Sequence, residues 1–209
     1  MLDVDSGEAL IRPFRPDDLE DLYRICLLTA DSGQDATRLI GDPRLPGQIF
    51  AAPYGVFQPS LAFMAEDGAG TAGYIVGALD SQEFEKTLES RWWPALRERY
   101  PEPRGEAGQW TKEQYYTHLI HHPPSTPDEL ARSYPSHLHI NLLPGLQGRG
   151  IGRRLIETLA GALRDQGSPG LHLHVGPANQ RAAEFYAHVG FTEQPGVPPR
   201  LFTMDLRAP

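Results

Sequence analysis

What the chain contains little of already restricts its chemistry. Among its 209 residues Cys26 is the only cysteine, so neither an internal disulfide nor a cysteine-based zinc site can form. Its neighbours Leu22, Ile25, Leu27 and Leu28 are apolar, which predicts a buried thiol on a helix and not a nucleophile. No apolar run approaches the ~20 residues that a membrane-spanning helix requires.

Positive charge is also scarce. The chain has 19 lysine and arginine residues against 27 aspartate and glutamate residues, a formal net charge of -8. This balance argues against nucleic acid as a partner, because phosphate backbones require a basic footprint. It suits a basic substrate such as an amine, although many acidic cytosolic proteins have it for solubility alone. The N-terminal residues 1–10 are too acidic for a signal peptide, so we expect a cytoplasmic protein with no membrane partner.

The pattern of strands and helices predicts an α/β fold in one domain spanning residues 1–209. We expect strands at residues 8–14, 61–66, 72–79, 137–143, 171–175 and 201–206. We expect helices at residues 17–27, 82–100, 112–120, 150–166 and 178–189. Residues 81–134 form a helical insertion before the His137 strand. The 137–143 and 171–175 strands should be parallel, with their carboxyl ends at one edge of a mixed, twisted sheet that has helices on both faces.

A glycine loop lies directly between the 137–143 strand and the helix that follows it. It reads Gln147-Gly148-Arg149-Gly150-Ile151-Gly152-Arg153. The free N–H groups of such a loop, together with the helix dipole, suit a pyrophosphate, and glycine lets phosphate oxygens reach the backbone. The loop lacks the Lys-Ser/Thr ending of a P-loop and the spacing of an NAD fingerprint. On this loop alone, a turn that binds nothing stays open as the alternative.

Two motifs carry a resemblance to a known family. The loop resembles the Gln/Arg-x-x-Gly-x-Gly/Ala signature of GNAT acetyltransferases, and residues 179–191 resemble the Asn-x-x-Ala-x-x-Phe-Tyr-x-x-x-Gly-Phe helix of that family. The resemblance implies the GNAT fold, acetyl-CoA as co-substrate, and direct attack by a primary amine in a ternary complex. It implies cofactor contacts from the loop, from backbone amides near Leu142 and Leu143, and from Asn179, Ala182 and Tyr186. Tyr186 would protonate the departing thiolate.

A narrower resemblance is carried by three short segments. Residues 92–97, 134–136 and 184–186 resemble bacterial acetyltransferases related to the C-terminal acetyltransferase-like domain of animal O-GlcNAcase. The animal domain is regarded as a pseudo-enzyme, whereas its bacterial relatives retain the cofactor loop, as this chain does. The alternative function is therefore an acetyl-CoA-binding pseudo-acetyltransferase with a binding or regulatory role.

The general base is less well defined by the sequence. Alternation places His137, His139 and Asn141 on one face of their strand, and His172 and His174 on one face of the next. Relatives in the family commonly carry an acid at the place of Asn141, and an amide cannot accept a proton. We assign catalytic roles to Tyr186, Asn141 and His139, with Asp80, Glu66 and His118 as further candidates for the base. The paired histidines leave a metal site open as an alternative, although we expect none.

The insertion is expected to flank the pocket for the acceptor. Tyr115 and His118 lie one helical turn apart and could face the cleft together, and Asp80 ends the preceding strand. We assign these three residues to substrate binding. The acceptor is expected to be an amine, either a small molecule or a peptide lysine, and the family resemblance allows a homodimer.

Overall fold

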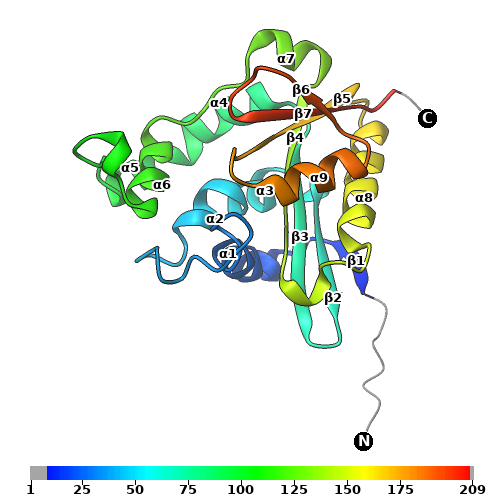
Figure 1. Ribbon diagram of the computed structural model, residues 1–209, viewed down its shortest axis with the longest axis horizontal. Coiled ribbons are helices and arrows are strands. Elements are labelled where there is room, and N and C mark those ends of the chain that lie inside the picture. Colours follow the sequence, from blue (N-terminus) through cyan, green and yellow to red (C-terminus); the bar gives the residue numbers. More distant parts are fainter. Residues whose placement is uncertain (1–8, 208–209) are drawn as a thin grey trace, which may run out of the picture.

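The computed structural model describes residues 9–207, so the acidic N-terminus and the start of the first predicted strand lie outside the described residues. A seven-stranded sheet runs through the described residues in the order β1-β2-β3-β4-β5-β7-β6 (Figure 1). Its strands are β1 (Leu10–Pro13), β2 (Ala62–Asp67), β3 (Gly70–Ala78), β4 (Ser136–Leu142), β5 (Gly170–Val175), β6 (Thr192–Gln194) and β7 (Arg200–Asp205). The β4–β5 pair is parallel and the other pairs are antiparallel. The predicted mixed sheet is thus confirmed.

Helices cover both faces of this sheet, as predicted. They are α1 (Leu19–Leu27), α2 (Leu45–Phe50), α3 (Ala52–Phe57), α4 (Ser81–Arg91), α5 (Trp93–Arg99), α6 (Lys112–His121), α7 (Asp128–Ser133), α8 (Ile151–Asp165) and α9 (Gln180–His188). One apolar core joins the sheet to α8 and α9, and a second joins the opposite face to helices α1 to α6. None of the helices in the described part of the chain is long and apolar enough to cross a bilayer.

Strand β4 presents different side chains to the two cores. Leu138, Ile140 and Leu142 belong to the core under α8. Asn141, His139 and His137 pair with the β3 residues Tyr74, Val76 and Ala78, whose side chains lie in the core under α1 to α6. The polar row of β4 therefore faces helices α1 to α6. Cys26 also lies in this second core, and burial raises the pKa of its thiol to about 12, consistent with the predicted inert thiol.

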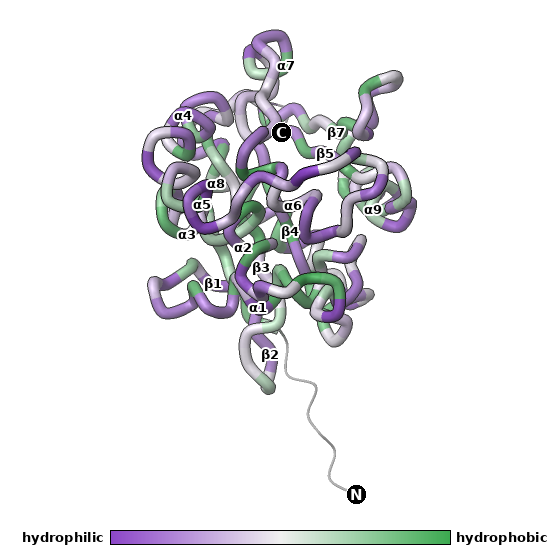
Figure 2. Tube along the Cα trace, turned by 90° about the vertical axis from the view of Figure 1, so that its left-hand side faces the viewer, coloured by the Kyte–Doolittle hydropathy of each residue, from purple (hydrophilic) through white to green (hydrophobic). Residues whose placement is uncertain are grey.

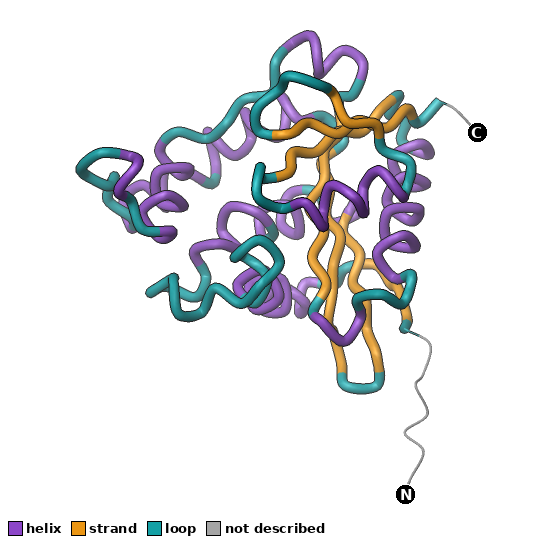
Figure 3. Tube along the Cα trace, in the orientation of Figure 1, coloured by secondary structure: helices purple, strands orange, loops and turns teal. Residues whose placement is uncertain are grey.

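The insertion between β3 and β4 differs from the prediction in two respects, one of which is the short helix α7, which was not predicted. The single helix expected over residues 82–100 is wrong, because α4 ends at Arg91 and α5 begins at Trp93. Pro94 stands in the first turn of α5, where its missing N–H and its ring prevent continuation of the preceding helix. The α5–α6 pair and the loop joining it project from the side of the sheet (Figure 3). Helix α4 buries only Ser81, Phe84 and Leu88, and its tube is correspondingly hydrophilic (Figure 2).

Candidate active site

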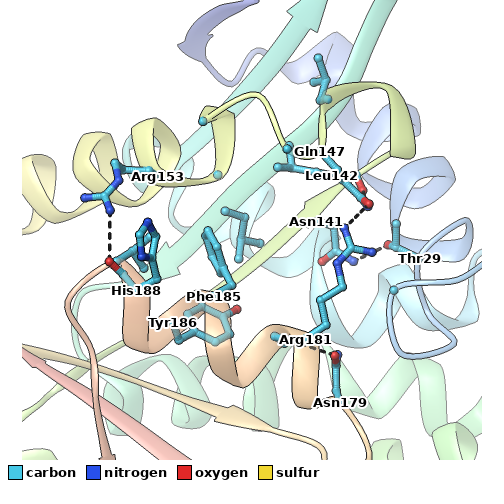
Figure 4. Close-up of a pocket in the computed structure, with 18 of the residues that line it drawn as sticks. Thr29, Asn141, Leu142, Gln147, Arg153, Asn179, Arg181, Phe185, Tyr186 and His188 are labelled. Carbon is cyan, nitrogen blue, oxygen red and sulfur yellow. Dashed lines mark hydrogen bonds between the residues drawn. The ribbon is translucent and has the colours of Figure 1, made fainter.

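A pocket opens where the two parallel strands part. β4 and β5 pair through only Ser136 with Leu171 and His137 with His172. Beyond this point β4 stays against β3 and β5 stays against β7, so a wedge opens toward the carboxyl ends of both strands. A pocket of about 560 Å³ lies there (Figure 4). Its lining comprises Thr29, Ser32, Gly33, Ile140, Asn141, Leu142, Leu146, Gln147, Gly148, Gly150, Gly152, Arg153, Asn179, Arg181, Ala182, Phe185, Tyr186, His188 and Val189.

The predicted glycine loop forms one wall of the pocket. Gly150 caps α8 in the left-handed conformation, with φ +75° and no side-chain cap. The N–H groups of the first turn of α8 therefore lack helical partners and, with the helix dipole, favour an anion. Gly152 also lines the pocket, as predicted for a cofactor residue, and it has a second role, because a Cβ there would lie 2.9 Å from Cζ of Phe185. Gly152 permits close packing of α8 on α9.

The charge of the pocket is opposite to that of the whole chain. No aspartate or glutamate belongs to the described lining residues, whereas Arg153, Arg181 and His188 do. Arg153 donates a hydrogen bond to the carbonyl oxygen of His188 at 3.1 Å. Arg181 donates to Oε1 of Gln147. Arg153 thus borders the pocket in the first turn of α8 and Arg181 borders it beside Gln147, and their positive charge suits a phosphorylated ligand.

Three of the predicted cofactor residues do not line the pocket. The N–H of Leu143 donates to the carbonyl of Ala72 at 2.8 Å, so the predicted cofactor contact from that amide is wrong. Successive N–H groups along a strand point to opposite edges, so the amide of Leu142 is directed into the wedge. Ile151 is buried in the core under α8. Arg149 donates to the carbonyl of Gly145 at 3.2 Å.

Tyr186 lies in the pocket wall with a well-packed ring. Ring centroids of Phe185, Phe191 and Phe202 lie 5.3, 5.5 and 5.9 Å from its own, and the residue is 9% exposed. Burial raises the pKa of its phenol above the ordinary value of 10, so the hydroxyl is protonated at neutral pH. The structure therefore provides a neutral O–H donor in the pocket.

Asn141 is oriented by a residue that the sequence analysis did not identify. The hydroxyl of Thr29 donates to the carbonyl of Ile25 at 2.7 Å, so its oxygen accepts the hydrogen bond from Nδ2 of Asn141. This fixes the amide with Oδ1 as a remaining acceptor at the pocket. Thr29 lies 112 residues from Asn141 in the chain, and no local pattern signals the contact. Arg181 was equally missed, although it lies inside the second motif.

The strand histidines differ in how fully their nitrogens are engaged. The hydroxyl of Ser81 donates to the carbonyl of Pro135, so Nδ1–H of His137 donates to Ser81 Oγ at 2.6 Å and Nε2 accepts from Tyr54 at 2.7 Å. His139 lies 5.4 Å, centroid to centroid, from Tyr54, and burial lowers its pKa to about 4. His139 is therefore neutral at pH 7, but it does not belong to the pocket lining.

The next strand does not complete a metal site with these histidines. Nδ1 of His172 bonds to the carbonyl of Tyr134 at 2.7 Å, and both nitrogens of His137 are engaged. Among residues 9–207, none of the strand histidines belongs to a set of three side chains whose donor atoms lie close enough together to share a metal ion.

The residues predicted to bind the acceptor are not brought to the pocket. Asp80 is the N-cap of α4 and accepts from the N–H of Glu83 at 3.0 Å, at the end of β3 remote from Leu142. Tyr115 is 51% exposed on α6. The ring of His118 contacts Trp110 instead. Glu66, a candidate base, forms an ion pair with Arg12.

The chain is similar to known acetyltransferases in sequence and in fold. The sequence profile of the Acetyltransferase (GNAT) family matches residues 55–191. Protein O-GlcNAcase of Rattus norvegicus is 28% identical over 188 residues, which are 88% of this chain and 20% of that protein. The chain thus spans about a fifth of the length of this curated relative.

Solved structures extend the comparison. The crystal structure of SsHAT has a TM-score of 0.87 at 38% identity, covering 96% of this chain and 99% of that one. Polyamine N-acetyltransferase of Drosophila melanogaster has a TM-score of 0.60 at 20% identity, covering 95% and 100% of the two chains. The second likeness concerns the fold alone.

Proposed function

The chain belongs to the GNAT family of acetyltransferases, and from that premise we propose that it transfers the acetyl group of acetyl-CoA to a primary amine. The acceptor nitrogen attacks the thioester directly in a ternary complex, with no covalent enzyme intermediate. The proposal treats the chain as a single acetyltransferase domain with an insertion at residues 81–134. A homodimer and a cytoplasmic location stay predictions from the sequence.

The observation that carries the proposal is that one pocket combines the open edge of β4 with the start of α8, where an anion is favoured. The open edge of β4 offers the N–H of Leu142 to an extended amide-bearing arm. The start of α8, with Arg153 in its first turn, offers donors and positive charge to a pyrophosphate, and Arg181 beside Gln147 adds a second positive charge to the pocket. A ligand with a phosphorylated end and an amide-containing arm satisfies both features, and acetyl-CoA is such a ligand.

The proposed chemistry assigns one task to each polar group. Oδ1 of Asn141 accepts a hydrogen bond from the acceptor amine and orients it toward the thioester. Burial lowers the pKa of His139 to about 4, too low for an effective base at neutral pH, so the proton lost by the nitrogen passes to solvent water in the pocket. The Tyr186 hydroxyl donates a proton to the thiolate sulfur as the carbon–sulfur bond breaks. Asn141 fixes position only, since an amide cannot act as the base.

The acceptor is proposed to reach the thioester from the face of the sheet that carries α1 to α6. Asn141 projects toward this face, and Thr29, Ser32 and Gly33 contribute to the pocket from the end of α1 and the following loop. The fold neighbours include enzymes named for polyamine and agmatine acetylation. We propose an amine of a small molecule or a peptide lysine as the acceptor class.

The first test is isothermal titration of acetyl-CoA into the wild type, Gly150→Glu and Gly105→Glu. Both glycines have positive φ and open space at the Cβ position, so the two variants share their backbone strain. Gly105 lies in the loop between α5 and α6, away from the pocket lining. We expect binding by the wild type and by Gly105→Glu, and at least tenfold weaker binding by Gly150→Glu, whose carboxylate repels the pyrophosphate. Equal affinity in all three proteins would refute the site.

Turnover is tested separately with a panel of amines and detection of released coenzyme A. Release that depends on an amine supports N-acetyl transfer. Tight acetyl-CoA binding without release for any amine would instead favour a pseudo-acetyltransferase.

A further inference from the structure

The loop between α5 and α6 brings together three possible metal ligands outside the pocket. Glu102 lies in this loop, and His118 and His122 lie at the C-terminal end of α6. One donor atom from each of the three side chains lies within 4.8 Å of the other two. None of the three residues lines the wedge, and the α5–α6 pair projects to the side of the sheet (Figure 1). This cluster is therefore a feature of the insertion itself.

The two histidines are aligned by the helix. A spacing of four residues places them on the same face, and their ring centroids lie 4.5 Å apart with an interplanar angle of 32°. The N–H of His122, the C-cap residue of α6, donates to the carbonyl of His118 at 2.8 Å, so the helical hydrogen bonds extend as far as His122. Both imidazoles therefore already lie side by side in the structure.

Glu102 reaches the histidines from a distant part of the chain. Its Oε1 lies 2.5 Å from Nε2 of His122, across a separation of 20 residues in the sequence. The adjacent His121 is directed elsewhere, with its Nε2 bonded to the carbonyl of Tyr100 at 2.7 Å. His118 and His122 therefore belong to the cluster with Glu102, whereas His121 does not.

The surroundings leave room for a further ligand. The ring of Trp110 packs against His118, with centroids 4.7 Å apart, and closes one side. The side chains of His122 and Glu102 are 55% and 52% exposed, so the other side is open to water. Two imidazoles, one carboxylate and an open position make up a donor set that zinc accepts.

We infer that Glu102, His118 and His122 form a binding site for a divalent transition metal of the zinc type. Donors at ~2.1 Å from a tetrahedral ion lie about 3.4 Å apart, so the Glu102–His122 contact widens by about 1 Å on binding. Glu102 can move by this amount because its side chain is about half exposed and belongs to a loop without regular structure. The ion replaces the hydrogen bond between the two side chains and joins the loop to the end of α6. Its proposed role is structural, as a clip for the insertion.

The test uses untagged, chelator-treated full-length protein and zinc chloride. Isothermal titration should give one zinc ion per chain for the wild type and at least about tenfold weaker binding for His118→Gln and His122→Gln, since even loss of an outer-shell partner costs 10–100-fold. His121→Gln is the matched control and should bind as the wild type does. Circular dichroism and thermal unfolding without metal verify that each variant is folded.

Two further measurements test the inference, and two results of the titration would contradict it. Cobalt(II) should give the visible absorption of a tetrahedral site in the wild type, and zinc should raise the unfolding midpoint of the wild type but not of folded His118→Gln. Absence of stoichiometric binding would overturn the inference and leave a hydrogen-bonded pair. Binding that the two substitutions leave unchanged would overturn it as well, because the zinc would then bind elsewhere on the chain. None of these zinc measurements depends on acetyl-CoA binding, so they test the zinc site separately from the proposed function.

Discussion

Replacing Tyr186 with phenylalanine removes one hydroxyl from the pocket and little else. The ring packs against three phenylalanines, and phenylalanine keeps those contacts. No described residue donates to or accepts from the hydroxyl through a hydrogen bond that would be lost. The unfolding free energy should therefore change by less than about 0.5 kcal/mol, because the substitution leaves no cavity at the ring and breaks no hydrogen bond among the described residues.

The catalytic effect should be much larger than the effect on stability. A positioned general acid contributes about 10²–10⁴ in rate, which corresponds to roughly 3–5 kcal/mol of barrier. Burial raises the phenol pKa, so the proton is available across the whole neutral range. We expect kcat to fall at least about 100-fold while the Kd for acetyl-CoA stays within about threefold, because the lost interaction develops only as the thiolate leaves.

The assay is release of coenzyme A with the best amine found for the wild type, together with titration of acetyl-CoA. Tyr23→Phe is the matched control, since Tyr23 is buried outside the pocket and its hydroxyl donates only a 3.2 Å hydrogen bond to Gln48. Its kcat should match the wild type. A Tyr186→Phe protein with wild-type kcat would show that the thiolate is protonated by another group, and the proposed role of Tyr186 would be abandoned.

Other predictions concern packing and pH. Gly152→Val should lower the unfolding free energy by about 1–3 kcal/mol, because its Cβ would lie 2.9 Å from the Phe185 ring; chemical denaturation measures this, and Gly145→Ala, whose Cβ meets open space, should show no comparable loss. Burial lowers the pKa of His172 from 6.5 to about 4, so the unfolded chain binds the extra proton and stability should fall by up to about 3 kcal/mol from pH 7 to pH 4. Urea unfolding should show a shallower pH dependence in His172→Gln, and an unchanged slope would refute the assignment. Arg12→Met should cost about 3–5 kcal/mol, since it leaves the buried carboxylate of Asp18 unpaired. Because Arg12 lowers the pKa of Asp18 below 3.8, this contribution is present above that pH and should disappear as acid protonates the carboxylate; a variant as stable as the wild type at pH 7 would contradict this.

The features that sequence could predict are those set by local pattern. Alternation and helical periodicity predicted six strands close to their observed positions, while the three-residue β6 was too short to produce a pattern. The glycine loop was predicted from its place between a strand and a helix, and the structure has Gly150 at the N-cap of α8. The break at Trp92 was missed because the apolar spacing continues through it, although Pro94 was a sufficient signal.

The features that sequence could not predict depend on long-range packing. Thr29 orients Asn141 only because the end of α1 packs beside β4. Asp80 and Tyr115 were assigned to the acceptor from their places along the chain, yet Asp80 caps a helix and Tyr115 faces solvent. Spacing could predict that Tyr115 and His118 lie on the same side of a helix. It could not predict whether that side faces the pocket, because this depends on how the insertion packs.

The short contact between β4 and β5 has a consequence for how the molecule holds together. Two residue pairs are all that join the two parts of the sheet by strand pairing, so backbone amides facing the wedge, such as that of Leu142, should exchange with solvent faster than the neighbouring amide of Leu143, which is bonded to Ala72. An extended ligand lying in the wedge supplies hydrogen bonds that a strand would otherwise supply. A ligand bound in the pocket would therefore also link β4 to β5. Slower hydrogen exchange at the Leu142 amide would report both ligand binding and this link between the two parts of the sheet.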